Sequence, residues 1–386
     1  MRKTLLSLLC FFAITFIMAQ PFLIVGTYTS GASEGIYVYT FDQQTGAAKL
    51  VSTAKTSNPS YLAISPNGKY VYAVNENADT TGPFIGGSVT AFAFSKSTGQ
   101  LTAINQQASK GKHPCYITTS NNGQWVVVGN YSSGTVAVLP VQKNGALRKA
   151  SSTVQHTGSG PNTARQQSAH VHGTVLTNDN QYLLVPDLGM DKVVVYRFSK
   201  GTGKLTGVPA FTASTKPGSG PRHLVLDAQN KYAYLTEELT GNVTVFQFQK
   251  GKLAAVQTIS AHPAGYTGDI SSADIHLSPD GRFLYCSNRG ASNTIAIFQI
   301  NKANGQLSLV GHQSTLGIKP RNFNFDPSGN FLLVANQETS QIVVFKVNKA
   351  TGLLTDTGNR IDVPNPVCLK WIDGYHYSVM MGVEPE

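Results

Sequence analysis

Residues 278–283 read SPDGRF, a polar turn followed directly by an aromatic residue, and this pattern decides the fold because it recurs along the chain. The copies are SPNGKY (65–70), SNNGQW (120–125), TNDNQY (177–182), DAQNKY (227–232), SPDGRF (278–283) and DPSGNF (326–331). The aromatic residues of successive copies are 55, 57, 50, 51 and 48 residues apart. A period of this length indicates a repeat architecture.

A second unit accompanies each turn, and it consists of an alternating strand, a polar turn with glycine and a short strand. Its seven copies are GIYVYTFDQQTGAAKL (35–50), GSVTAFAFSKSTGQL (87–101), GTVAVLPVQKNGAL (134–147), DKVVVYRFSKGTGKL (191–205), GNVTVFQFQKGKL (241–253), NTIAIFQINKANGQL (293–307) and SQIVVFKVNKATGLL (340–354). The alternation, as in Val193 and Val195, is typical of half-buried antiparallel strands. Four strands per unit and seven units predict an all-β, seven-bladed β-propeller.

The two ends of the repeat region complement each other. Residues 22–28 (FLIVGTY) match the strand that follows the aromatic residue, so the chain begins in the middle of a blade. Asn365-Pro366-Val367 match Asn58-Pro59-Ser60, which start an inner strand. We therefore expect the N- and C-terminal strands to pair and to close a ring spanning residues 22–374, which removes an exposed sheet edge. Residues 375–386 form a C-terminal tail that the repeat does not place.

Composition narrows the classes of function. Only 13% of the 386 residues are charged and 41% are hydrophobic, which excludes a disordered chain. The formal charge is +10, but the basic residues are scattered and no run of five Lys or Arg occurs. This dispersed excess favours a small anionic ligand and argues against nucleic acid as a partner.

The N-terminal segment has the pattern of an export signal. Arg2 and Lys3 precede an apolar run from Leu5 to Met18, and Ala19 suits a cleavage site. Residues 1–19 are therefore predicted to be a signal peptide, the mature chain to be periplasmic or secreted, and no membrane span to remain. One of the four cysteines, Cys10, lies in this segment. The remaining three, Cys115, Cys286 and Cys368, are odd in number and are expected to be buried without disulfides.

Two positions in each repeat are expected to border one mouth of the central channel, because an inner strand begins where its partner ends. Ten residues before each aromatic residue stand Ser60, Cys115, His172, Arg222, Ala273 and Arg321. Six residues after the aromatic position stand Tyr28, Glu76, Tyr131, Leu188, Glu238, Arg289 and Gln337. On three consecutive blades these sets combine His172, Arg222, Glu238 and Arg289, which we predict to be catalytic. A carboxylate or imidazole can accept a proton, and guanidiniums can hold an anion. A structural Arg–Glu pair between blades is the alternative interpretation.

Further polar residues are expected near this mouth. The segment 156–172 is longer than its equivalents and carries Arg165, Gln166 and His170, which we assign with Asp187, Arg321 and Gln337 to substrate binding. His170 and His172 could be two metal ligands, but no third ligand has a convincing spacing, so no metal or cofactor is expected. Asp274 and His276 are expected deeper in the channel. GSGP occurs at 158–161 and 218–221, where it could cradle phosphate oxygens or form an ordinary loop.

Five motifs together resemble the seven-bladed propeller lactonase family, over roughly residues 22–372. They are RQQSAHVH (165–172), PDLGMDKV (186–193), GPRHL (220–224), TEELTGNV (236–243) and SPDGRFLYCSNRG (278–290). The family includes bacterial propeller-type 6-phosphogluconolactonases and resembles the fungal carboxymuconate lactonising enzymes. The resemblance implies functional roles for the histidine of the HxH motif (His172 or His170), Arg222, Glu238 and Arg289.

We therefore expect an exported lactonase that hydrolyses a sugar-type lactone, with a small anionic lactone or sugar acid as its ligand. Propeller 6-phosphogluconolactonases of sugar catabolism are expected in the cytoplasm, so the export signal puts the phosphorylated substrate in question more than the lactonase chemistry. A muconate-type cycloisomerase, which closes a lactone ring instead of opening one, would use the same side chains and is the second hypothesis. A propeller that binds glycans or proteins without catalysis is the third hypothesis, because propellers host many functions.

Overall fold

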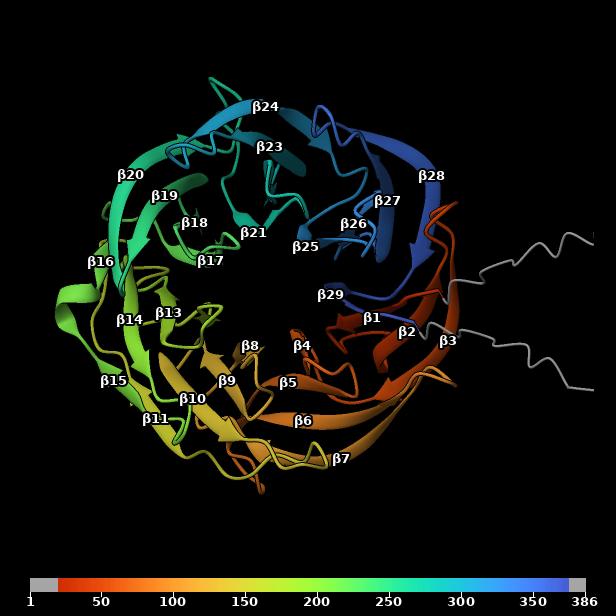
Figure 1. Cartoon of the computed structure of the whole chain (residues 1–386), viewed down its shortest axis with the longest axis vertical. Helices are drawn as coiled ribbons and strands as arrows, with labels where there is room; N and C mark the ends of the chain where they lie inside the picture. Colours follow the sequence, from red (N-terminus) through yellow and green to blue (C-terminus); the bar gives the residue numbers. More distant parts are fainter. Residues whose placement is uncertain (1–19, 375–386) are drawn as a thin grey trace, which may run out of the picture.

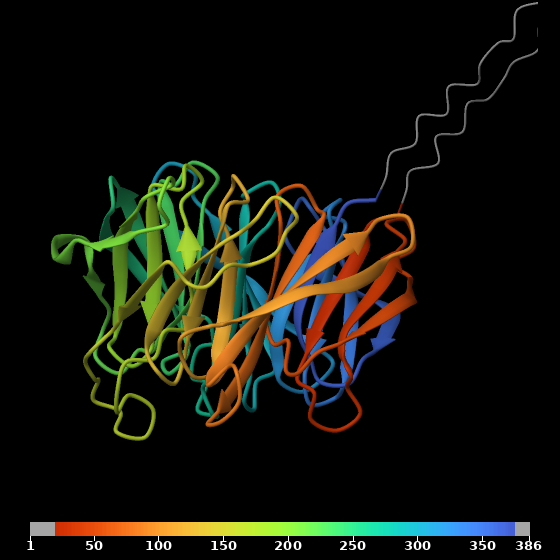
Figure 2. The same ribbon diagram turned by 90° about the horizontal axis from the view of Figure 1, so that it is seen from below.

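The repeated units form seven antiparallel sheets arranged as blades around a central channel (Figure 1). The computed structural model describes residues 20–374, and the predicted signal peptide and C-terminal tail lie outside the described residues. Seen from the side, the ring is a thick disc whose strands run between its two faces (Figure 2). The prediction of a seven-bladed β-propeller is confirmed.

The strands of each blade follow one another from the channel outward. The first three blades, in this order of strands, are β29 (Pro366–Ile372), β1 (Phe22–Thr27), β2 (Gly35–Phe41), β3 (Ala48–Lys55); β4 (Leu62–Ile64), β5 (Tyr70–Asp79), β6 (Gly86–Ser95), β7 (Gln100–Ala108); and β8 (Pro114–Thr119), β9 (Trp125–Asn130), β10 (Thr135–Pro140), β11 (Ser152–Gln155). The next two are β12 (Val175–Leu176), β13 (Tyr182–Asp187), β14 (Lys192–Phe198), β15 (Leu205–Gly207) with β16 (Ala213–Ser214); and β17 (Pro221–Leu226), β18 (Tyr232–Glu237), β19 (Asn242–Gln249), β20 (Lys252–Ser260). The last two are β21 (Ser272–Leu277), β22 (Phe283–Asn288), β23 (Thr294–Ile300), β24 (Leu307–Ser314); and β25 (Pro320–Phe325), β26 (Phe331–Asn336), β27 (Gln341–Val347), β28 (Leu354–Asp362).

The ring closes through the two ends of the chain. Strand β29 pairs antiparallel with β1, and Figure 1 shows them side by side. The amide of Tyr28 donates to the Asn365 carbonyl at 3.2 Å, just as the amide of Glu76 donates to the Asn58 carbonyl at 3.0 Å. Asn365 and Asn58 therefore make the same backbone hydrogen bond in their blades, as their predicted equivalence implies.

Each recurring aromatic residue packs against a glycine in the turn between the two outer strands of the next blade. The Tyr70 ring meets Gly145, and the Trp125 ring meets Gly203. The same side chains hydrogen-bond to that turn, since Tyr70 Oη donates to the Lys143 carbonyl at 3.2 Å and Trp125 Nε1 donates to the Lys200 carbonyl at 2.8 Å. The two repeated features of the sequence, the aromatic residue and the glycine-containing turn, therefore contact each other, and this contact joins each blade to the next.

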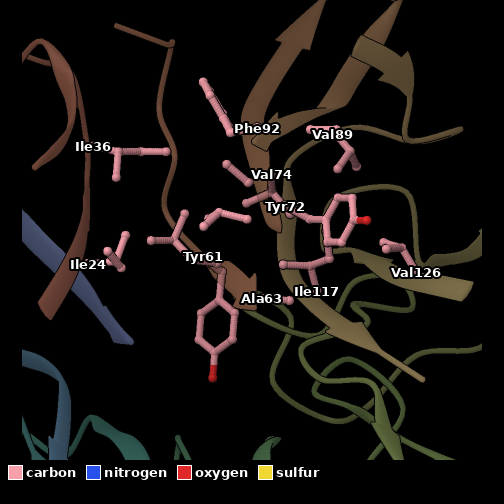
Figure 3. Close-up of a cluster of buried hydrophobic side chains, with 14 of the residues drawn as sticks. Ile24, Ile36, Tyr61, Ala63, Tyr72, Val74, Val89, Phe92, Ile117 and Val126 are labelled. Atoms are coloured by element: carbon pink, nitrogen blue, oxygen red, sulfur yellow. The ribbon is translucent and has the colours of Figure 1, made fainter. Parts of the chain in front are cut away.

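Apolar side chains fill the space between adjacent sheets. Figure 3 shows one such cluster, in which Ile24, Ile36, Val74 and Phe92 come from neighbouring blades. Because the core is distributed between blades, the seven sheets leave the central channel free for polar groups.

The blade of β12–β16 departs from the repeat. Its outer strand is split into β15 and β16 by a short 3₁₀ helix, η1 (Pro209–Phe211). Pro209 lacks an amide hydrogen and cannot continue a strand ladder, which explains the break.

Among residues 20–374, the structure contains no helix with the length and apolar character of a membrane span.

Replacing Gly305 with alanine is expected to lower the free energy of unfolding by about 2–4 kcal/mol. Gly305 has φ of 73°, and an added Cβ would lie 2.4 Å from Cδ1 of the Tyr232 ring. Urea denaturation measures the effect. Gly311→Ala is the matched control, because an added Cβ there meets nothing closer than Leu353 at 3.9 Å. Equal stability of the two variants would contradict the packing role of the turn glycine.

Candidate active site

The carboxylate of Glu238 is the centre of a polar cluster at one mouth of the channel. Its Oε2 atom accepts a hydrogen bond from Arg222 Nε at 2.9 Å and lies 3.3 Å from Arg289 Nη2. Its Oε1 atom accepts from Arg165 Nη2 at 2.6 Å. His172 Nε2 lies 3.6 Å from Oε2. The structure thus brings together the four residues predicted to be catalytic and adds Arg165 to them.

The cluster fixes the charge states of its members. Burial would raise the pKa of Glu238, but Arg289, Arg222 and the other cations around it hold that pKa well below its usual range. Burial and the nearby Arg222 guanidinium lower the pKa of His172 well below its usual value. At neutral pH the carboxylate is therefore ionised and the imidazole is neutral.

Two of the arginines keep an amino group that is not engaged by the protein. Arg222 uses Nε on Glu238 and Nη1 on His223 and on the Ala273 carbonyl at 2.5 Å. Arg289 uses Nε and Nη2 on the carbonyls of Ser271 and Ser272 at 3.2 Å each. Within residues 20–374, Nη2 of Arg222 and Nη1 of Arg289 make no hydrogen bond, so they can donate to a bound oxygen.

A buried network behind Arg222 holds its guanidinium. Arg222 Nη1 lies 3.1 Å from His223 Nε2, and His223 Nδ1 lies 2.7 Å from Asp274 Oδ1. Burial and Arg222 lower the pKa of His223 to about 3, so the ring is neutral. The ring then donates from Nδ1 to Asp274 and accepts at Nε2 from Arg222. Asp274 Oδ2 also contacts His276 Nε2 at 2.9 Å, so the two residues expected deeper in the channel contact each other.

Sequence analysis did not select His223, and the reason is local geometry. Successive residues of a regular strand point to opposite faces, so Arg222 and His223 would not be expected to act together. The pairing of β17 with β18 is irregular between Pro221 and Leu224. This irregularity allows both side chains to reach the same polar network.

The long segment 156–172 is held by buried polar groups, two of which were predicted to bind substrate. Asp187 Oδ2 lies 2.7 Å from His156 Nδ1, while its Oδ1 accepts from the amide of His170 at 2.8 Å. Gln166 is fully buried and donates to the Leu188 carbonyl at 2.8 Å. The structure therefore places Asp187 and Gln166 within the protein interior, where they support the segment that carries Arg165 and His172.

His170 and His172 both border Tyr131. The ring of His170 stacks on Tyr131 with centroids 4.5 Å apart, and His172 meets the same ring edge-on at 5.1 Å. Among residues 20–374, no three His, Cys, Asp or Glu side chains are arranged to hold a metal ion.

The three cysteines of the described region, Cys115, Cys286 and Cys368, are buried and free, as expected. Cys115 Sγ lies 3.7 Å from His172 Nδ1. Burial raises the pKa of its thiol, so the side chain is not an activated nucleophile.

In the blade that follows that of Arg289, Arg321 lies on β25 and Gln337 directly follows β26, and both were also predicted to bind substrate. Arg321 Nη2 donates to Tyr28 Oη at 2.8 Å, and its guanidinium lies 5.2 Å from the centre of the Tyr28 ring. Gln337 is partly buried, and its Oε1 atom is buried without a hydrogen-bond partner among residues 20–374. The structure thus joins Arg321 directly to Tyr28, and among residues 20–374 Arg321 forms no hydrogen bond or ion pair with Glu238.

A recess of about 840 Å³ lies elsewhere on the molecule. It is lined by the turns at the opposite ends of the strands, including Asp227, Lys231, Ser278 and Asp280. Among residues 20–374, no ion pair joins two residues that line this recess, whereas three arginines meet the Glu238 carboxylate. The chemistry therefore favours the mouth near Glu238 as the functional site.

Comparison with known proteins agrees with this fold. Residues 22–371 match the family model described as "Lactonase, 7-bladed beta-propeller". A 6-phosphogluconolactonase of Bacillus subtilis is 38% identical over 351 residues, which cover 90% of this chain and 97% of the relative. A crystal structure of a putative 6-phosphogluconolactonase from Bacteroides fragilis is 42% identical, with a TM-score of 0.86 over 92% of this chain and 98% of that one. The periplasmic gluconolactonase of Pseudomonas aeruginosa is 40% identical, with a TM-score of 0.87 over 92% and 99%.

Proposed function

Because the chain belongs to the seven-bladed β-propeller lactonase family, we propose that it hydrolyses a sugar-type lactone at the Glu238 cluster. The observation that carries this proposal is the convergence of Arg222, Arg289 and Arg165 on one buried carboxylate, with unengaged guanidinium amino groups left over.

In the proposed reaction, a water molecule attacks the lactone carbonyl carbon. The carbonyl oxygen becomes an oxyanion, which Nη2 of Arg222 and Nη1 of Arg289 stabilise by hydrogen bonds. The bond between the carbonyl carbon and the ring oxygen then breaks, and the ring oxygen takes up a proton. The product is the open-chain hydroxy acid.

His172 is the better proton acceptor for the attacking water. Its imidazole is neutral, whereas the Glu238 carboxylate is engaged by guanidiniums on both oxygens. Glu238 then has two roles, since it holds the arginines in place and stabilises the imidazolium that forms 3.6 Å away. Glu238 itself as the base is the alternative assignment.

The charge of the mouth favours an acidic or electron-rich lactone. Arg165, Arg222, Arg289 and Arg321 outnumber the carboxylates near them, and relatives are named as lactonases of gluconolactone and 6-phosphogluconolactone. We also infer export, because residues 1–19 have the pattern of a signal peptide and one relative is described as periplasmic. The mass of the protein recovered from a periplasmic extract tests for a chain that starts near Gln20.

A panel of lactones tests the proposal. We expect the purified protein to accelerate opening of glucono-δ-lactone, or of its 6-phosphate, above the spontaneous rate, followed with a pH indicator. Ultraviolet loss of a muconate chromophore without lactone hydrolysis would identify a cycloisomerase instead. No acceleration of any aldonolactone would overturn the proposal.

A further inference from the structure

A second carboxylate stands at the mouth in the position equivalent to Glu238. In the blade of β17–β20, Arg222 on the inner strand contacts Glu238, which lies 16 residues later. In the blade of β4–β7, Ser60 contacts Glu76, also 16 residues later. The repeat thus places the same carboxylate twice, but it supplies a guanidinium in one blade and a hydroxyl in the other.

The hydrogen bonds of Glu76 differ from those of Glu238. Glu76 Oε2 accepts from Tyr28 Oη at 2.9 Å and from Ser60 Oγ. Within residues 20–374, Glu76 forms no ion pair and its Oε1 accepts no hydrogen bond. Glu76 and Tyr28 are partly exposed, while Ser60 is buried beneath them. The structure therefore offers a charged acceptor, held by two hydroxyls, with one oxygen unused.

Glu76 faces the same mouth as the arginines. Cys115 occupies the repeat position between Ser60 and His172, and its Sγ atom is 3.7 Å from His172 Nδ1. On the other flank, Tyr28 joins Glu76 to Arg321. Burial lowers the pKa of Arg321, but Tyr28, Glu76 and Glu238 raise it above its usual value, so the guanidinium stays charged.

We propose that Glu76, positioned by Ser60 and Tyr28, forms a subsite for the hydroxyl groups of a polyhydroxylated lactone. This inference rests on the proposed lactone hydrolysis. An ionised carboxylate only accepts hydrogen bonds, so its free oxygen suits a neutral hydroxyl donor and repels an anion. A bound sugar lactone then directs its carbonyl or anionic substituent to the arginines and its hydroxyls to Glu76. A lactone without hydroxyls has nothing to donate there.

Two lactones with the same six-membered ring test this subsite. In Glu76→Gln, we expect KM for glucono-δ-lactone to rise about 10- to 100-fold, because a charged acceptor of substrate hydroxyls is lost. We expect kcat/KM for δ-valerolactone, which has no hydroxyls, to stay within about twofold. Ser60→Ala, which removes only one support of the carboxylate, should show the same selectivity with a smaller effect.

Controls separate hydroxyl recognition from other roles. Glu338→Gln removes an exposed carboxylate that pairs with Lys319 at 2.9 Å, and both kinetic constants should be unchanged. An equal loss on both lactones in Glu76→Gln would overturn the subsite and assign Glu76 to the chemistry itself. Unchanged kinetics on both would also overturn it. Melting curves show whether each variant is folded.

Failure of the proposed function gives a different pattern from failure of the subsite. If the unmodified protein hydrolyses neither lactone, the proposed hydrolysis is wrong, and calorimetric titration decides the subsite separately. We then expect D-gluconate to bind the unmodified protein at least 10-fold more tightly than hexanoate, and Glu76→Gln to remove that preference. Equal binding of the two acids by the unmodified protein would overturn the subsite.

Discussion

Replacing Arg222 with alanine is expected to lower kcat for a sugar lactone by about 100- to 1000-fold, the usual cost of losing one oxyanion donor. Arg222 is 1% exposed, donates to Glu238 through Nε and keeps Nη2 unengaged. Its removal takes away an oxyanion donor and one of the groups that fix Glu238. Initial rates of lactone opening, corrected for the spontaneous reaction, measure the effect.

Two comparisons show whether this loss is chemical. Arg222→Lys retains the positive charge but not the planar fork, so it should recover only part of the activity. Arg360→Ala removes an arginine that pairs with Asp356 at 2.7 Å on the outermost strand β28, and it should leave kcat unchanged. Full activity in a folded Arg222→Ala protein would refute the assigned role.

The sequence was sufficient to predict the ring because every blade repeats the same turn at nearly the same interval. Equal positions in a closed repeat lie at equal heights around the axis, so register alone brought His172, Arg222, Glu238 and Arg289 to one mouth. The long spacing in the chain does not matter for such residues. The repeat fixes their neighbours in space.

Where the chain departs from the repeat, the same reasoning loses its basis. Residues 156–172 form a longer segment than their equivalents in the other blades, and the structure shows that Gln166 and Asp187 support this segment from the interior. Sequence reasoning could identify them as polar but could not tell a buried support from a ligand. His223 was missed because an irregular strand pairing cannot be read from alternation.

Glu76 illustrates a third limit. It appeared in the register beside Glu238, yet nothing in the residue type distinguished a carboxylate held by arginines from one held by hydroxyls. The difference comes from the residue that contacts each carboxylate, which stands ten residues before the aromatic position. This residue is Arg222 in one blade and Ser60 in the other. Reading each carboxylate together with this contacting residue would have distinguished Glu76 from Glu238 in the sequence.

The buried carboxylate of Asp274 gives the second large expected effect. Its Oδ1 accepts from His223 Nδ1 at 2.7 Å, and its Oδ2 accepts from Asn322 Nδ2 and lies 2.9 Å from His276 Nε2. Donors therefore face both oxygens. An amide has only one acceptor atom, so Asp274→Asn must set its NH₂ group against one of these donors.

Either orientation of the new amide is costly, and one of them disturbs the site directly. If the NH₂ group faces His223, the imidazole must carry its proton on Nε2, where Arg222 Nη1 now donates at 3.1 Å. Two donors would then meet, and the Arg222 guanidinium would move. We expect Asp274→Asn to lower stability by about 3 kcal/mol and kcat by about 10- to 100-fold through this positioning role.

A matched substitution distinguishes positioning from a general loss of stability. Asp326 is equally buried at 1% exposure and accepts from Gln43 Nε2 at 2.9 Å and from the Phe331 amide at 2.7 Å, in a turn at the opposite ends of the strands. Asp326→Asn should also lower the denaturation midpoint, yet it should leave kcat unchanged at a temperature where both variants are folded. If both variants lost activity only in proportion to unfolding, Asp274 would have no role beyond stability. A fall in kcat confined to folded Asp274→Asn would support a positioning role through the hydrogen bonds from Asp274 to His223 and from His223 to Arg222.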